Sequence, residues 1–168
     1  MVATTLAETA SLWAIRISMI LMVLVFGAEL RGAKPTGIVI AQLWCLGALF
    51  ALAHSTGAML TFHHGSQEAA LESTARQTEQ VVGLRIGAGL YVNYLFVFVW
   101  HVDAALRLLV PNHYARFPNS YRYWVIGFLI FIAINGAIVF QSGVTRYVGI
   151  ACLAILGTFV LRRDRKNS

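Results

Sequence analysis

The sequence predicts an all-α protein, a polytopic membrane helix bundle with about five transmembrane helices and one short amphipathic helix on the outer surface. Of its 168 residues, 58% are hydrophobic and only 12% are charged, whereas roughly 25% are charged in an ordinary soluble domain. The mean hydropathy is +0.70. A soluble domain of this size could not bury so much apolar surface, but a bilayer solvates it. We therefore expect one integral membrane domain over residues 1–168.

The expected membrane spans are apolar stretches close to the length of about 20 residues that a helix needs to cross a bilayer. They cover residues 10–30, 36–62, 86–109, 123–140 and 144–161. The links 31–35 and 141–143 are brief, so the helices on either side of each link must be antiparallel neighbours. Pro111 and Pro118 bracket the link between the third and fourth spans, and we expect them to keep it non-helical.

A polar stretch between the second and third spans predicts the amphipathic helix, over residues 66–82. Ser66 is a typical N-cap, and Glu68 follows in the first turn, where a negative charge is favoured. Gly83 is a typical helix stop. Leu71 and Ala75 fall on one side of this helix and the charged residues fall near the other. We expect it to lie on the outer membrane surface.

The distribution of basic residues predicts the orientation. With the N-terminus outside, the inner side holds Arg31, Lys34, Arg107, Arg116, Arg122, Arg162, Arg163, Arg165 and Lys166, and the outer side holds Arg16, Arg76, Arg85 and Arg146. This positive-inside bias predicts that the N-terminus is outside and the C-terminus is cytoplasmic, and we expect the membrane to be a bacterial inner membrane. If the fourth or fifth span were re-entrant, the N-terminus would move inside. We attribute the net charge of +6 to basic residues that interact with the headgroups of the lipid bilayer, and we expect no nucleic-acid partner.

Polar side chains within the spans predict a site in the outer half of the membrane. Counting along the helices places His54, Asn93, Asn135 and Arg16 in one layer roughly 8–12 Å below the outer boundary, with Tyr94 beside it. Such side chains usually face the bundle interior and have partners. The layer fits a pocket for a metal, a prosthetic group or a lipid-like ligand. The alternative is a hydrogen-bonded network that fixes the helices in register.

The histidines and acidic residues at the outer side suggest a metal-binding site. His64, Glu68 and Glu72 are spaced i, i+4 and i+8, and His63 and His54 could complete a shell for iron, zinc or manganese. The alternative is a solvated face, because Glu72 and Arg76 form a favourable i, i+4 ion pair. Haem is less favoured, since His54 and His101 differ in depth by roughly 10 Å.

Three further features carry structural expectations. Asp103 and Arg107 are four residues apart near the inner end of the third span, where we expect them to pair, with Arg107 extending toward the headgroups. His101 is expected to be a neutral, hydrogen-bonded core residue. Cys45 and Cys152 lie in apolar runs and are expected to be unpaired.

The sequence leaves the activity open. It contains no Walker A loop, nucleophile elbow, H-E-x-x-H or C-x-x-C motif, and whether it is an enzyme is undecided. Three functions remain. The first is a ligand- or metal-binding protein acting as a redox or metabolic membrane subunit. The second is a structural or assembly subunit, with membrane protein partners or as a homo-oligomer. The third is a transporter, which the absence of an inverted repeat disfavours.

Overall fold

The computed structural model describes residues 5–140 and 143–167, and side chains up to residue 159. Within these ranges every regular element is helical, as predicted. The elements are α1 (Leu6–Leu30), α2 (Ile38–Thr61), α3 (Gln67–Val82), α4 (Gly89–Leu109), α5 (Pro111–Tyr114), α6 (Asn119–Ile134), the π-helical turn η1 (Asn135–Val139) and α7 (Gly143–Asn167).

Four helical segments are long and apolar enough to cross a membrane: α1, α2, α4, and α6 together with η1. The apolar part of α7 that can be assessed, Gly143–Phe159, is shorter, so a fifth crossing stays a prediction. Large apolar side chains face outward along these helices, such as Phe98 at 65% and Leu24 at 55% exposure. A bilayer solvates such surfaces, which supports a membrane-embedded bundle. The side chains of the basic tail, Arg162, Arg163, Arg165 and Lys166, lie outside the described part.

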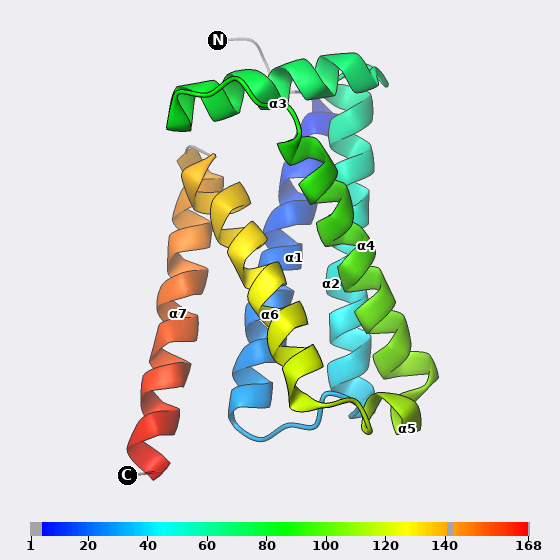
Figure 1. Ribbon diagram of the computed structural model, residues 1–168, viewed down its shortest axis with the longest axis vertical. Helices are drawn as coiled ribbons and strands as arrows, with labels where there is room; N and C mark the ends of the chain where they lie inside the picture. The colour runs from blue at the N-terminus through cyan, green and yellow to red at the C-terminus, as the bar shows by residue number, and fades with distance from the viewer. Residues whose placement is uncertain (1–4, 141–142, 168) are drawn as a thin grey trace.

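The long helices form a ring in which each packs on the next (Figure 1). The order around the ring is α1, α2, α4, α6 and α7, and α7 returns to pack on α1. The helix α3 lies across one end of this bundle, where α1 begins, and α7 ends at the opposite end. We call the end that carries α3 the outer end and the opposite end the inner end.

Large aromatic side chains fill the middle of the ring. Trp44 of α2 and Trp100 of α4 are buried with ring centroids 4.8 Å apart, and Phe26 of α1 lies 5.0 Å from Trp44. Gly47 of α2 leaves the space for Trp100, since a Cβ there would meet the indole at 2.8 Å. Close packing of these rings brings α1, α2 and α4 into contact along their central turns.

Local signals explain the helix boundaries, including those that were wrong. α1 begins four residues before the predicted span, because Thr5 and Glu8 form a capping box. α3 begins after Ser66, whose hydroxyl accepts from the Ala69 N–H, and ends at Gly83, whose φ is 76°, as predicted. The link after α4 is not wholly non-helical as expected. Pro111 starts the one-turn helix α5, because proline is favoured in a first turn.

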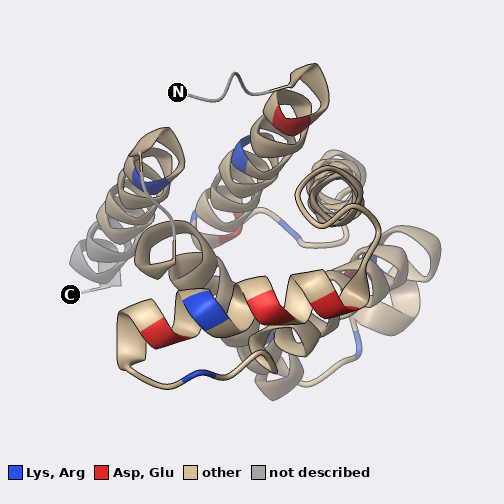
Figure 2. Cartoon of the chain, turned by 90° about the horizontal axis from the view of Figure 1, so that it is seen from above, with Lys and Arg blue, Asp and Glu red and all other residues tan. Residues whose placement is uncertain are grey.

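The position of α3 is fixed by glycine at the start of α4. A Cβ on Gly87 would lie 2.7 Å from the Leu71 carbonyl oxygen, so the two backbones touch. The Tyr94 hydroxyl donates to Oε1 of Gln67 at 2.8 Å, which ties the start of α3 to α4. Seen from above, α3 runs along one side of the bundle and leaves the outer ends of α1 and α7 uncovered (Figure 2). The helix α3 therefore covers only part of the outer end of the bundle.

Candidate functional site

The polar layer predicted in the outer half separates into pairs that do not meet. His54 Nδ1 lies 3.0 Å from the Ser11 carbonyl oxygen and 3.2 Å from its hydroxyl, which joins α2 to α1. Arg16 Nε donates to the Thr145 hydroxyl at 3.2 Å, which joins α1 to α7. Asn135 donates to the Phe131 carbonyl on its own helix at 2.7 Å. The first two contacts join α1 to α2 and to α7, which is the register-fixing interpretation in a weaker form, whereas the Asn135 contact stays within one helix.

The other two members of the predicted site lie near α3 or on the surface. Tyr94 bonds Gln67, as described above. Asn93 is exposed on α4. Among the described residues, no hydrogen bond joins any two of His54, Asn93, Tyr94, Asn135 and Arg16. Sequence depth placed them at similar heights, but height alone does not specify which neighbour each side chain faces.

The structure does not support the predicted metal shell of His54, His63, His64, Glu68 and Glu72. Within the described residues, no three His, Cys, Asp or Glu side chains lie close enough to hold a metal ion. Glu72 instead pairs with Arg85 and, at 3.9 Å, with Arg76. The solvated face therefore accounts for this charge run. Partial burial, and then the neighbouring charge of His64, lower the pKa of His63 below its ordinary value.

His101 is hydrogen-bonded within its own helix. Its Nδ1 lies 2.7 Å from the Val97 carbonyl oxygen, so the expected hydrogen bond is confirmed, although the residue is only half-buried. Its Nε2 is buried without a partner among the described residues. His54 faces Ser11 rather than His101, so these two histidines do not form a shared site.

A cluster of ionised side chains is buried at the inner end, and Asp103 is at its centre. Its side chain is fully buried. Oδ2 accepts from Trp44 Nε1 at 2.8 Å and from Arg107 Nε at 2.7 Å. Oδ1 accepts from the hydroxyls of Tyr114 at 3.0 Å and Tyr121 at 3.3 Å. Four donors thus saturate one carboxylate and connect α2, α4, α5 and α6.

Arg107 extends this cluster to α1. Its Nη1 pairs with Glu29, whose second oxygen accepts from Arg122 Nη2 at 3.2 Å. The guanidinium also lies over the ring of Trp44, 4.6 Å from its centroid. The predicted Asp103–Arg107 pair is confirmed. The expectation that Arg107 extends toward the headgroups was wrong, because Glu29 gives it a buried partner and it is only 1% exposed.

The charges in this cluster balance, with two carboxylates against two guanidinium groups. A buried ion pair is tolerated when its charges are compensated and its hydrogen bonds are satisfied. Arg107 Nη2 and Arg122 Nε are the cluster atoms that are buried without a partner in the described structure. The cluster therefore fixes five helices to one another at the inner end and has no free carboxylate for catalysis.

Sequence reasoning missed Glu29 and Arg122 as members of this cluster, although a signal was present. Glu29 lies at the last turn of its span, and Arg107 at the last turn of another, both at the inner boundary. Their equal depth and opposite charge could have been used to predict that Glu29 and Arg107 pair. Their actual contact required the ring order of the helices, which loop lengths alone do not give.

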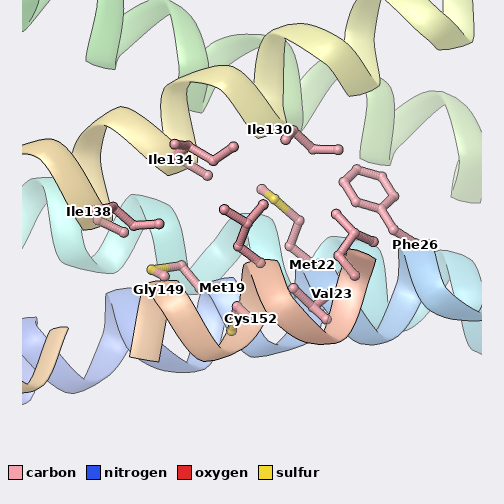
Figure 3. Close-up of a pocket in the computed structure, with 13 residues that line it drawn as sticks. Met19, Met22, Val23, Phe26, Ile130, Ile134, Ile138, Gly149 and Cys152 are labelled. Atoms are coloured by element: carbon pink, nitrogen blue, oxygen red, sulfur yellow. The ribbon is translucent and has the colours of Figure 1, made fainter. Parts of the chain in front are cut away.

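An apolar cavity of about 40 Å³ lies between α1, α6, η1 and α7. The residues that line it are Met19, Met22, Val23, Phe26, Ile130, Ala133, Ile134, Ala137, Ile138, Gly149, Cys152, Leu153 and Leu156. Figure 3 shows Met19, Met22 and Ile134 among the side chains around this space. Every lining side chain is apolar or sulfur-bearing, so apart from the weakly polar sulfur atoms the cavity offers water no hydrogen-bond partner.

The π-helical turn shapes one wall of this cavity. The Phe140 N–H bonds the Asn135 carbonyl five residues back, at 3.0 Å, which widens the helix there. Gly149 of α7 packs against this turn, and a Cβ there would lie 3.0 Å from that of Ala137. α7 packs mainly on α1 and η1 and has little contact with α6 itself. The cavity therefore lies where α7 meets the α6–η1 segment mainly through η1.

Comparisons with known proteins add no relative: no family model, no curated protein and no solved structure matches the chain.

Proposed function

We propose that this protein binds the hydrocarbon chain of a membrane lipid in the apolar cavity between α1, α6, η1 and α7. The observation that carries the proposal is the lining of that cavity, which contains no charged or hydrogen-bonding side chain except the thiol of Cys152. An apolar space of this kind stays dry and accepts apolar ligands. This keeps the lipid-like ligand of the sequence interpretation and moves its site from the polar layer to the space between α1, α6, η1 and α7.

The volume of the cavity determines how much of the lipid chain it can accommodate. About 40 Å³ is well below the roughly 150 Å³ of an apolar cavity that binds a benzene ring. It accommodates the last carbons of one chain, not a ring system. Two methionines, Met19 and Met22, line it, and their unbranched side chains adjust easily to a chain of varying shape.

The rest of the molecule supports such a role by keeping the other helix contacts fixed. The buried cluster around Asp103 joins α1, α2, α4, α5 and α6, and α7 is outside it. A chain that enters beside α7 therefore needs to displace only α7 and η1. In this proposal the outer end faces the periplasm of a bacterial inner membrane and the basic tail of the chain faces the cytoplasm.

Photo-crosslinking tests the proposal. The protein is reconstituted in phosphatidylcholine vesicles that contain a phosphatidylcholine with a diazirine at the end of one chain. After irradiation, we expect peptide mapping to find adducts concentrated on Met19, Met22 and Cys152. Ala133→Phe, which fills the cavity, should remove these adducts, whereas Ala53→Phe on the exposed face of α2 should not. Adducts spread evenly over lipid-facing residues such as Leu24 and Phe98 would refute the proposal.

A second function, as a subunit of a larger membrane complex, is favoured by Asn93. This amide is exposed on α4, and a polar side chain in a membrane helix is stabilised by a partner helix. Cross-linking in native membranes tests it. A specific product that disappears in Asn93→Leu supports the second function, and a strictly monomeric protein contradicts it.

A further inference from the structure

Arg16 lies one helical turn beyond the outer end of the apolar cavity. It is three residues before Met19 on α1, which is a rise of about 4.5 Å, and on the same side of that helix. On α7 the matching position is Thr145, four residues before Gly149. The hydrogen bond from Arg16 Nε to the Thr145 hydroxyl, 3.2 Å long, spans the two helices directly above the cavity.

The positive charge of Arg16 has no carboxylate partner within the described residues, whose ion pairs all involve other arginines. Nε is used by Thr145, and the guanidinium lies 5.0 Å from the ring centroid of Trp13. Both terminal amino groups remain without a hydrogen bond in the described structure. The nearest acidic residue along α1, Glu8, is occupied by the helix cap, where it accepts from the Thr5 N–H at 2.8 Å.

A second positive charge lies at the same level. Arg146 is exposed in the first turn of α7, next to Thr145. It too forms no ion pair among the described residues. The first N–H groups of α7 lack partners within the helix, and its positive dipole end points the same way. The ribbon of α3 does not cross the outer ends of α1 and α7 (Figure 2), and the side chain of Arg146 is exposed there.

The geometry points to an anionic phospholipid as the ligand, with its phosphate held by Arg16 and Arg146 and the end of one chain in the cavity below. This inference rests on the proposed function and specifies its ligand class. A guanidinium binds phosphate oxygens in pairs through its parallel N–H groups, and Arg16 has both terminal groups available. Trp13, 52% exposed beside it, is typical of the level at which headgroups lie.

The test compares two diazirine lipids with identical chains, one with a phosphatidylglycerol and one with a phosphatidylcholine headgroup. We expect labelling of Met19, Met22 and Cys152 to prefer the anionic lipid. Each arginine should raise the labelling ratio of anionic to zwitterionic lipid by a factor of roughly 5, which is the gain in affinity for an anionic surface that one basic residue contributes. Arg16→Gln and Arg146→Gln should each reduce the preference, Arg16→Lys should retain most of it, and Arg76→Gln on α3 should leave it unchanged.

The outcomes separate the two proposals. Equal labelling of the cavity by both lipids, unchanged in Arg16→Gln, overturns the headgroup inference and leaves the chain-binding proposal in place. Absence of cavity labelling by either lipid overturns both. Folding of Arg16→Gln is judged by circular dichroism and gel filtration. If this variant does not fold, Arg146→Gln provides the test, because Arg146 lies on the surface. If the labelling preference for the anionic lipid is unchanged in Arg146→Gln, the role assigned to Arg146 in binding the headgroup is overturned.

Discussion

The indole N–H of Trp44 donates to Asp103 across the α2–α4 interface at 2.8 Å, and both side chains are fully buried. The same carboxylate oxygen also accepts from Arg107, whose guanidinium lies over the Trp44 ring. Three groups on two helices thus contact one another within the core. This contact makes Asp103 the residue on which the inner end of the bundle depends.

Asp103→Asn should lower the free energy of unfolding strongly. The change removes the negative charge that faces Arg107 and leaves a buried cation with a single partner, Glu29. Breaking a buried ion pair from one side costs roughly 3–5 kcal/mol. Thermal unfolding in detergent micelles, followed by circular dichroism, measures the effect. Glu72→Gln is the control, because that ion pair is exposed and contributes about 0–1 kcal/mol. Equal losses in both variants would contradict the central role of Asp103.

Trp44→Phe should be destabilising by a smaller amount. The variant keeps an aromatic ring beside Trp100 but removes the N–H that Asp103 accepts. An unsatisfied buried acceptor costs roughly 1–3 kcal/mol, to which the lost volume adds. The matched control is Trp13→Phe, at a position that is 52% exposed. The same thermal measurement applies, and a Trp44 variant as stable as the Trp13 variant would show that the hydrogen bond is dispensable.

Alkaline pH should destabilise the protein through Tyr114, which lies outside the membrane spans. Burial, opposed by the charge of Arg107 and helped by Asp103, raises the pKa of Tyr114 above its ordinary value of 10.0. The unfolded chain therefore loses this proton first as the pH rises. The stabilisation is present below pH 10 and is lost progressively above it.

Tyr114→Phe isolates that contribution. The variant should be less stable than the wild type at neutral pH, because it lacks the hydrogen bond to Asp103. The difference between the two proteins should narrow above about pH 10, since only the wild type loses the Tyr114 proton. Thermal unfolding from pH 7 to 11 tests this. A difference that stays constant across that range would mean that Tyr114 does not titrate with folding.

Features set by residues close in sequence could be predicted, whereas contacts that depend on which helices are neighbours could not. The helix α3, with its Ser66 cap and Gly83 stop, follows from residues close in sequence, and so does the Asp103–Arg107 pair. The prediction of a shared polar site was wrong because the depth of a residue in the membrane does not specify the direction in which its side chain points. His54 and Arg16 do lie on core-facing helices, but one faces α1 and the other faces α7. Which helix each contacts depends on the order of the ring.

The cavity could not be predicted from the sequence for a related reason. Its lining residues are ordinary apolar residues of three helices, and no periodicity distinguishes them from lipid-facing ones. The π-helical turn at Asn135–Val139 and the contact of Gly149 with Ala137 lie beside this space. Neither feature is encoded by a recognised motif. The π turn in particular is defined by a single hydrogen bond, from the Phe140 N–H to the Asn135 carbonyl.

The attachment of α3 depends on Gly87, and Gly87→Val should loosen it. The new side chain would overlap the Leu71 backbone oxygen, which lies 2.7 Å from a Cβ at this position. Backbone cannot yield as a flexible side chain can, so α3 must move away from the start of α4. The rings and ion pairs inside the bundle are distant from this contact, and we expect its thermal stability to change little.

Limited trypsin digestion in vesicles measures this movement at Arg76 and Arg85, which lie in and just after α3 on the outer side. Cleavage there should be faster in Gly87→Val than in the wild type, because local opening of α3 exposes the sites. Gly127→Val is the matched control, since no atom lies within 4 Å of a Cβ at that position on α6. If both variants are cleaved at the wild-type rate, the close approach of Gly87 to Leu71 is not what holds α3 against the bundle.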